Sequence, residues 1–215
     1  MPLSPLENVT IESTAHAVSL ASDIIRDMEN SESKELKLEL QDNEWPFERT
    51  THDRSIARAI CFDDDGYFYF MRVERDDDFG RATLIETSGG GIEEGEDPET
   101  AVRRELKEEL GADTDVVCKI GMVSDYYNLI HRHNLNNYFL CRIRSFGEKH
   151  MTRYEIEDFK LSTLKVTFEE AVNEYEKNKV TPLGRLITGR ELPVLLKAKE
   201  ILDDLQRCAY ERQQG

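Results

Sequence analysis

Three glutamates in the middle of the chain have the spacing needed to act together. Glu105, Glu108 and Glu109 stand at positions i, i+3 and i+4. In a helix, that spacing places the three carboxylates within about one third of the circumference. Like charges at this spacing repel one another, and a bound cation would remove the penalty. Carboxylates are preferred ligands of Mg²⁺ and Mn²⁺, so the cluster predicts a divalent-cation site, although a solvated acidic face has the same pattern.

The helix that must carry these glutamates is marked at both ends. Asp97 suits an N-cap, Pro98 the first helical position, and Gly111 the position just past the end. These signals predict a helix over 98–110. Its apolar positions form a stripe beside the glutamates, made of Val102, Leu106 and Leu110. One flank of the helix is therefore expected to pack on a sheet while the adjacent flank holds the charges.

The segment before the helix is rich in glycine. Ala82 to Thr87 is a short strand candidate that runs into Ser88, Gly89, Gly90 and Gly91. Glycine tolerates backbone conformations that other residues avoid, so a sharp bend is expected here. Glycine bend, helix and glutamates are contiguous in the chain.

This region resembles the signature of the Nudix hydrolases. The segment GGIEEGEDPETAVRRELKEELGA, from Gly90 to Ala112, follows the pattern Gly, five residues, Glu, seven residues, Arg-Glu-aliphatic-x-Glu-Glu-x-Gly-aliphatic. Eight of the nine specified positions match. Ala112 is small where a bulky aliphatic residue is usual, and Ser88 stands where relatives often carry proline.

The resemblance implies a role for each matching residue. Glu105, Glu108 and Glu109 would bind Mg²⁺ or Mn²⁺ together with a backbone carbonyl near Gly89. Gly90, Glu96 and Arg104 would support the loop against the helix. The implied reaction is attack by water on one phosphorus of a nucleoside diphosphate linked to another group X. The base that takes the proton would be Glu105, or Glu155 or Glu157 on a later loop, and the sequence does not choose between them.

Residues outside the signature are weaker candidates for substrate contacts. Arg72 and Arg81 precede the glycine segment and could meet phosphates, with surface solvation as the competing explanation. Tyr127 or its neighbour Tyr126 could stack on a base, although alternation in a strand would bury at least one of them. His131 and His133 are read as solvated loop residues.

The remaining elements complete an α/β (α+β) fold, in which a mixed β-sheet is sandwiched between helices as an αβα arrangement. A hairpin is predicted from 55–62 and 67–74 around Asp63 to Gly66, with a polar loop at 76–81. Further strands are expected near 34–40, 116–126, 137–144 and 159–166, and further helices over 13–28, 168–177 and 191–210. We divide the chain into an N-terminal extension (1–50), a Nudix domain (51–180) and a C-terminal helix (181–215).

Composition limits the partners. The formal net charge of −16 disfavours a nucleic-acid binder, because it repels the phosphate backbone. The four cysteines form no CxxC pair and are expected to be free thiols. No stretch has the roughly 18 apolar residues of a membrane span or the pattern of a signal peptide, so a cytoplasmic protein with no membrane partner is expected. Pairing of chains is common among Nudix relatives, which suggests a homodimer.

Two rival functions stay open. The first is a nucleotide-sensing module that keeps the fold without turnover, against which the complete glutamate set argues. The second is an enzyme like isopentenyl diphosphate isomerase, which shares the fold and the metal. That chemistry needs a reactive cysteine, and no cysteine here stands in a matching motif. The small-molecule substrate is expected to be of the nucleotide type, but its X group is not specified by the sequence.

Overall fold

A computed structural model of the chain describes residues 35–150 and 161–214. The chain divides into two compact units. The larger unit is Glu35–Lys199, which contains the glutamate helix. The smaller unit takes residues 1–34 and 200–215, of which only 200–214 are described, so the helix predicted over 13–28 lies outside the described residues.

One mixed sheet forms the centre of the larger unit. In the described part of the chain it has eight strands, in the order β1-β6-β7-β2-β3-β4, with β5 paired to β2 and β8 paired to β3. Pairing is parallel between β1 and β6 and between β2 and β7, and antiparallel elsewhere. The strands are β1 (Leu36–Leu40), β2 (His52–Phe62), β3 (Phe68–Asp77), β4 (Gly80–Glu86), β5 (Ser88–Gly91), β6 (Ala112–Tyr127), β7 (Arg132–Phe146) and β8 (Ser162–Val166).

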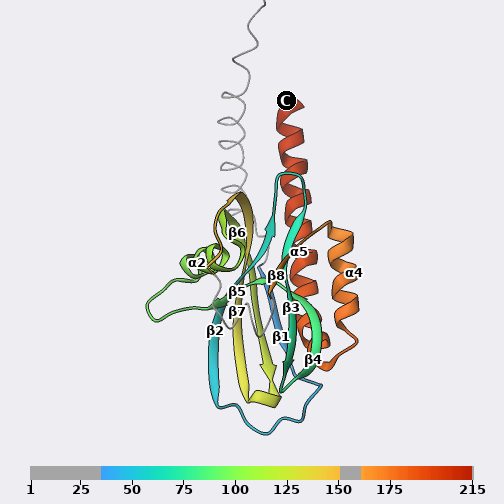
Figure 1. Cartoon of the computed structure of the whole chain (residues 1–215). Helices are drawn as coiled ribbons and strands as arrows, with labels where there is room; N and C mark the ends of the chain where they lie inside the picture. Colours follow the sequence, from blue (N-terminus) through green and yellow to red (C-terminus); the bar gives the residue numbers. More distant parts are fainter. Residues whose placement is uncertain (1–34, 151–160, 215) are drawn as a thin grey trace, which may run out of the picture. The chain divides into compact units, whose positions relative to one another are not determined.

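Helices cover both faces of this sheet. Helix α2 (Pro98–Leu110) lies on one face, while α4 (Phe168–Asn178) and the first part of α5 (Pro182–Gln214) lie on the other (Figure 1). The alternation of β2 explains the division, because Ala57 and Ala59 pack under α2 whereas Arg58, between them, reaches Glu191 of α5. The expected αβα arrangement is confirmed.

Helix α2 begins and ends where the local signals predict. The side chain of Asp97 accepts hydrogen bonds from the N–H groups of Glu99 and Thr100, both at 3.0 Å. At the other end Gly111 has φ +66° and its N–H donates to the carbonyls of Leu106 and Lys107. Substituting such an N-cap typically costs about 1 kcal/mol. Both ends of the glutamate helix are thus fixed locally.

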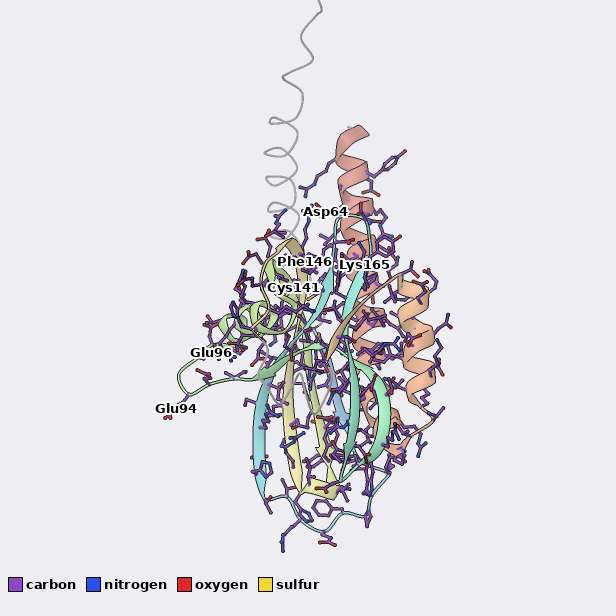
Figure 2. All side chains as sticks on the ribbon, viewed as in Figure 1. Asp64, Glu94, Glu96, Cys141, Phe146 and Lys165 are labelled. Atoms are coloured by element: carbon purple, nitrogen blue, oxygen red, sulfur yellow. The ribbon has the colours of Figure 1, made fainter. Side chains whose placement is uncertain are left out.

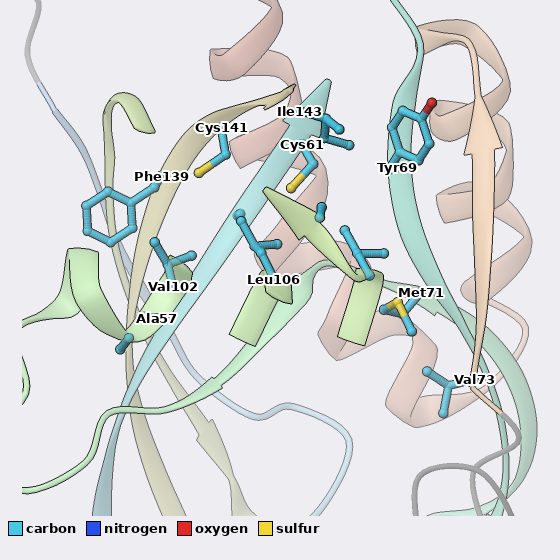
Figure 3. Packing of buried hydrophobic residues seen from close by; sticks show 14 residues of the cluster. Ala57, Cys61, Tyr69, Met71, Val73, Val102, Leu106, Phe139, Cys141 and Ile143 are labelled. Carbon is cyan, nitrogen blue, oxygen red and sulfur yellow. The ribbon is translucent and has the colours of Figure 1, made fainter. Parts of the chain in front are cut away.

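The apolar stripe of α2 is buried against the sheet. Val102 and Leu106 are fully buried and Leu110 nearly so, as the sequence pattern predicts. Their partners come from β2, β3 and β7, and Figure 3 shows Val102 and Leu106 among Ala57, Cys61, Phe139 and Cys141. The glutamates are held at the edge of this core because the helix cannot rotate without exposing the stripe.

Several strand boundaries differ from the predictions. The hairpin at Asp63 to Gly66 is present, with Gly66 at φ +84°. The predicted polar loop at 76–81 is wrong, because β3 continues to Asp77 and β4 begins at Gly80, so that only two residues form the turn. This hairpin could not be predicted because the end of β3 and the start of β4 are polar and look like a loop.

The C-terminal helix begins earlier than predicted. Helix α5 starts at Pro182, nine residues before the expected start at Glu191, and continues through Pro193. The prediction was wrong because Gly184, Gly189 and Pro193 all disfavour a helix interior. The strand expected near 34–40 is confirmed as β1, which pairs with β6 and so belongs to the sheet although we assigned it to the extension.

A buried polar network lies between α5 and the sheet. Glu191 is fully buried and accepts hydrogen bonds from the N–H of Thr87 at 2.8 Å and the hydroxyl of Tyr175 at 2.9 Å. Arg190 donates to Glu191 at 2.8 Å and to Asp125 at 3.2 Å. Burial raises the pKa of Glu191 and the two nearby arginines lower it, and the net direction is down. The network therefore holds charged groups in the interior by pairing them.

Candidate functional site

The glycine segment is a short strand rather than a free bend. Gly89 and Gly90 of β5 pair with Arg58 and Ala57 of β2. Gly89 has φ +139°, and a Cβ there would lie 2.1 Å from the carbonyl oxygen of Ala57. Only glycine fits such a close approach. The pairing fixes β5 beside α2 at the level of the glutamates.

Glu105 lies directly against this strand. A Cβ on Gly90 would stand 2.4 Å from Oε1 and 2.6 Å from Oε2 of Glu105. The space that a side chain would fill at position 90 is thus taken by the Glu105 carboxylate, whose side chain is 13% exposed. The second glycine of the segment is needed for this packing.

Glu109 contacts the same strand one residue earlier. The N–H of Gly89 donates to Oε2 of Glu109 at 3.0 Å. The charge of Glu109 also raises the pKa of Lys149, although burial is the larger effect and the net direction is down. Glu109 and Glu105 therefore both lie against β5, the first at Gly89 and the second at Gly90.

Arg104 joins the loop, the strand and the helix. Its guanidinium donates to both oxygens of Glu96, at 3.0 and 2.9 Å, and to the carbonyl of Gly91 at 3.0 Å. It also donates to Glu105 at 2.8 Å and lies 3.5 Å from Glu108. The hydrogen bond from Arg104 lowers the pKa of Glu96, and the reciprocal bond raises that of Arg104.

The loop braced by Arg104 extends away from the sheet. Figure 2 shows Glu94 in its outer part and Glu96 closer to the helix. Glu96 also accepts from the N–H of Glu93 at 3.0 Å, which closes a turn within the loop. The ion pair therefore fixes the returning half of the loop to α2.

The three glutamates are neighbours but their carboxylates do not yet converge. Glu105 and Glu109 turn toward β5, whereas the Glu108 side chain is 45% exposed. Within residues 35–150 and 161–214 no group of three His, Cys, Asp or Glu side chains is close enough to form a metal cluster. The fold supplies the register of the helix and, beside it, a strand that is paired to β2.

The other predicted site residues lie in different surroundings. Arg72 of β3 is paired with Glu174 of α4 at 3.2 Å, and Arg81 is exposed on β4. Tyr127 is only 4% exposed, and its hydroxyl accepts from Arg190 at 2.8 Å. Tyr127 is therefore part of the interior network, so its ring is not open for stacking on a base.

The proposed later loop lies outside the described residues. Glu155 and Glu157 fall between 150 and 161, where the structure is not described. The last described residue before them, His150, donates its N–H to the carbonyl of Glu108 at 2.9 Å. The chain thus enters this segment from beside the glutamate helix.

Sequence reasoning missed two arginines: Arg54, which lies against the glycine strand, and Arg132, whose charge acts on Arg54 from the neighbouring strand β7. Nη2 of Arg54 is 3.4 Å from the place of a Cβ on Gly91. Arg132, on the neighbouring strand β7, lies over the ring of Tyr127 at 5.3 Å. Neither is close to the signature in sequence, and only the parallel pairing of β2 with β7 brings them to this place.

A serine, histidine and aspartate also form a hydrogen-bonded chain on the sheet. Nε2 of His133 lies 2.8 Å from Oγ of Ser124, and its Nδ1 lies 2.7 Å from Asp53. A nucleophilic serine also needs donors for an oxyanion. Strand β6 is paired on both sides at Ser124, by β1 and by β7, so its backbone is already used in the sheet. We therefore interpret the hydrogen bonds among Ser124, His133 and Asp53 as structural contacts that hold the His133 side chain.

Comparisons with known proteins show the family to which the chain belongs. The NUDIX domain matches residues 52–183, and the chain therefore belongs to the NUDIX family. A NUDIX hydrolase from Nitrosomonas europaea is 15% identical, with a TM-score of 0.50 over 69% of this chain and 87% of that one. A MutT NUDIX hydrolase from Burkholderia pseudomallei is 18% identical, with a TM-score of 0.44 over 55% and 86%.

The structural likeness to the first of these proteins supports the fold alone. Among curated proteins no match was found. As a member of this family the chain is a Nudix hydrolase, and family members generally use a divalent metal. The described residues include no helix that is long and apolar enough to cross a membrane.

Proposed function

We propose that this protein is a metal-dependent hydrolase that cuts the diphosphate linkage of a nucleoside diphosphate joined to a group X. The observation that carries the proposal is the arrangement of Glu105 and Glu109 on consecutive glycines of β5, with Glu108 one turn away on α2. The family membership supports hydrolysis, and the side chains present support metal-assisted phosphate chemistry.

The residues fit Mg²⁺ or Mn²⁺ as ligands. All three side chains offer carboxylate oxygens, and a backbone carbonyl near Gly89 would add a fourth oxygen donor. The closeness of Glu105 to Gly90 leaves its carboxylate at the surface of the strand. Arg104, which contacts Glu105 and Glu108, shows that a positive charge is already accommodated at this spot. Side-chain rotation alone would let residues one turn apart share an ion.

A bound metal would supply neutralisation of phosphoryl charge and a lower pKa for the attacking water. The chain's own residues would do the rest. Arg104 and Glu96 hold the loop and so orient Glu105, and the capped helix keeps Glu108 and Glu109 in register. The proton is taken by Glu105, or by Glu155 or Glu157, all of which stay candidates.

The central test is Glu109→Gln, which keeps the side chain's size but removes its charge. Turnover should fall roughly 100-fold or more with saturating Mg²⁺, and the melting temperature should barely change. Glu99→Gln is the matched control, since Glu99 lies on the first turn of the same helix, exposed and paired with Arg103 at 2.8 Å. Equal turnover in the parent and Glu109→Gln would contradict the metal assignment.

The substrate is identified by a panel scored for products. Nucleotide sugars, dinucleoside polyphosphates, ADP-ribose and oxidised nucleoside triphosphates cover the main X groups. Activity should vanish in excess chelator and return with Mg²⁺ or Mn²⁺. If no diphosphate is cut but nucleotides still bind, the protein is a sensing module. If an isopentenyl diphosphate is isomerised instead, the second rival is correct.

We also propose a cytoplasmic location and leave the homodimer as a proposal that light scattering tests. The small-molecule substrate requires no nucleic-acid or membrane partner, and the net charge of −16 is consistent with neither. A measured mass near that of one chain would contradict the proposed homodimer.

A further inference from the structure

Arg54 lies against β5 at Gly91, one residue after the glycine that faces Glu105. Burial and the charge of Arg58 lower the pKa of Arg54, whereas the charge of Glu105 raises it, so Arg54 and Glu105 attract each other. Nη2, Nε and Cζ of Arg54 lie 3.4, 3.5 and 3.9 Å from the place of a Cβ on Gly91. The guanidinium therefore lies against the glycine backbone. Among the described residues, Arg54 has no hydrogen bond or ion pair, so its donors are open to a ligand.

A second arginine on the same sheet face has an unused donor. Arg54 is paired with Asn134, and Arg132 stands two residues before Asn134 on β7. Residues two apart in a strand share a face, so the two arginine Cβ atoms are roughly 8 Å apart, within reach of long side chains. The Nε of Arg132 is buried and has no partner among the described residues. A buried donor left unpaired is unfavourable, and a bound acceptor would remove that cost.

The two guanidinium groups repel each other. Burial lowers the pKa of Arg132 most, and the charge of Arg54 lowers it further. In residues 35–150 and 161–214 no carboxylate is ion-paired with either group, although the charge of Glu105 raises the pKa of Arg54 and that of Asp125 raises the pKa of Arg132. Arginine forks match phosphate geometry in particular, so an anion between them would reverse an unfavourable contact.

The position of this arginine pair relates it to the cleavage site. Neighbouring residues of a strand point to opposite faces. Gly90 accordingly faces Glu105 and Gly91 faces Arg54. A diphosphate that crosses the narrow glycine strand would meet Glu105 on one side and Arg54 on the other, with Arg132 close to Arg54 on β7.

We infer that Arg54 and Arg132 bind a phosphate of the X group, beyond the diphosphate that is cut. The substrate class is thus a nucleoside diphosphate whose X carries phosphate, such as a polyphosphate chain, rather than a neutral sugar. This inference rests on the proposed function for its substrate class, whereas the binding of phosphate by the two arginines does not depend on turnover.

The experiment compares two substrates with the same nucleoside, ATP and ADP-glucose, in four proteins. These are the parent, Arg54→Ala, Arg132→Ala and Arg144→Ala, all checked for folding by melting curve. Arg144 is the matched control because it lies near the other end of β7 and is paired with Asp115. Binding of sodium tripolyphosphate in chelator, measured by calorimetry, gives a second result that needs neither metal nor turnover.

We expect the parent to prefer ATP by kcat/KM. The preference should fall roughly 10- to 100-fold in Arg54→Ala and Arg132→Ala, mainly through KM, because a charge-assisted hydrogen bond is lost. Arg144→Ala should keep the preference of the parent for ATP. Tripolyphosphate should bind more weakly to the two variants by a similar factor. Arg54→Lys, which keeps the charge without the fork, should recover only part of the loss.

Each contrary result has its own meaning. If the variants lose kcat/KM equally for both substrates, the arginines bind the diphosphate itself and the inferred substrate class is overturned. If tripolyphosphate binds unchanged in both variants, the arginine site is overturned while cleavage can still be intact. If tripolyphosphate binding falls as expected but no diphosphate substrate is ever cut, the arginine site stands and the proposed function fails.

Discussion

The carboxylate of Glu105 occupies the space in which a side chain at Gly90 would have to lie, 2.4 Å from the place of its Cβ. One residue earlier, a Cβ on Gly89 would instead meet the carbonyl oxygen of Ala57 at 2.1 Å. The two adjacent glycines are therefore required for different reasons. Gly90 makes room for the end of a movable side chain, and Gly89 makes room for backbone.

Gly90→Ala should impair catalysis more than folding. The methyl group would push aside Glu105, which can rotate, so the loss of stability should stay at about 1 kcal/mol. The displaced carboxylate should lower kcat by roughly 100-fold. Urea unfolding and steady-state kinetics measure the two effects, and a variant with normal kcat would show that Glu105 is not needed at this place.

Gly89→Ala should instead impair folding. The positive φ and the collision with β2 cannot be relieved without moving the strand, so a loss of roughly 2–4 kcal/mol is expected. The same urea titration measures it. A Gly89→Ala protein as stable as the parent would contradict the close pairing of β5 with β2.

Arg104→Lys should lower activity while the fold is kept. Lysine retains the charge but cannot bond both oxygens of Glu96 and the carbonyl of Gly91 at once. Loss of such supporting contacts typically reduces activity or metal affinity 10- to 100-fold. Arg103→Lys is the control, since Arg103 on the same helix pairs with exposed Glu99. Metal titrations measure the affinity of both variants for Mg²⁺. Equal affinities in Arg104→Lys and Arg103→Lys would contradict the supporting role of Arg104.

Arg190→Met should strongly destabilise the protein. It leaves Glu191 and Asp125 charged in the interior with fewer partners, which typically costs 3–5 kcal/mol. Arg185→Met, on the same helix, removes a partly exposed pair with Glu44 and should cost at most about 1 kcal/mol. Denaturant unfolding at pH 7 compares them, and similar losses would rule out the buried network as a major stabilising feature.

The pH dependence of stability should reflect the same glutamate. Because the folded state lowers the pKa of Glu191, its contribution is present above the unfolded pKa of about 4.3 and is lost as pH falls through the folded value. Without Arg190, Arg58 and the Thr87 N–H would still oppose burial, so the pKa of Glu191 should be lowered less and the loss of stability on acidification should be smaller in Arg190→Met than in the parent. Unfolding between pH 3 and 7 compares the two slopes, and parallel curves for the parent and Arg190→Met would contradict the prediction.

Alkylation should distinguish the cysteines. Burial raises the pKa of Cys61 and of Cys141, and it raises that of Cys118 to about 11. Because the thiolate is the reactive form, these three thiols should resist iodoacetamide at pH 8 until the protein unfolds. Mass spectrometry of the native protein measures this, and rapid labelling of Cys61 would contradict its place in the core.

The sequence predicted those features that depend on neighbours along the chain. The ends of α2 follow from Asp97, Pro98 and Gly111, which are all local signals. The apolar stripe and the glutamate spacing follow from helical periodicity. The resemblance to the Nudix signature supplied the roles, because single-sequence physics cannot distinguish an acidic surface from a ligand set.

Features that depend on distant pairing could not be predicted. Arg54 reaches Gly91, and Arg190 reaches Asp125, only through the order of strands in the sheet. The early start of α5 could not be predicted because Gly184, Gly189 and Pro193 all disfavour a helix interior. Tyr127 looked like a stacking ring because a single strand pattern does not show which face α5 covers.

The pairing of β1 with β6 has a practical consequence for truncation. The family match begins at residue 52, yet Leu36–Leu40 supply the strand that satisfies the outer edge of β6 from Gly121 to Asp125. A fragment started at the family boundary would leave that row of backbone groups open to other molecules, and self-association in solution is the expected outcome. The homology boundary and the folding boundary of this protein therefore differ by at least sixteen residues, the distance from Leu36 to His52.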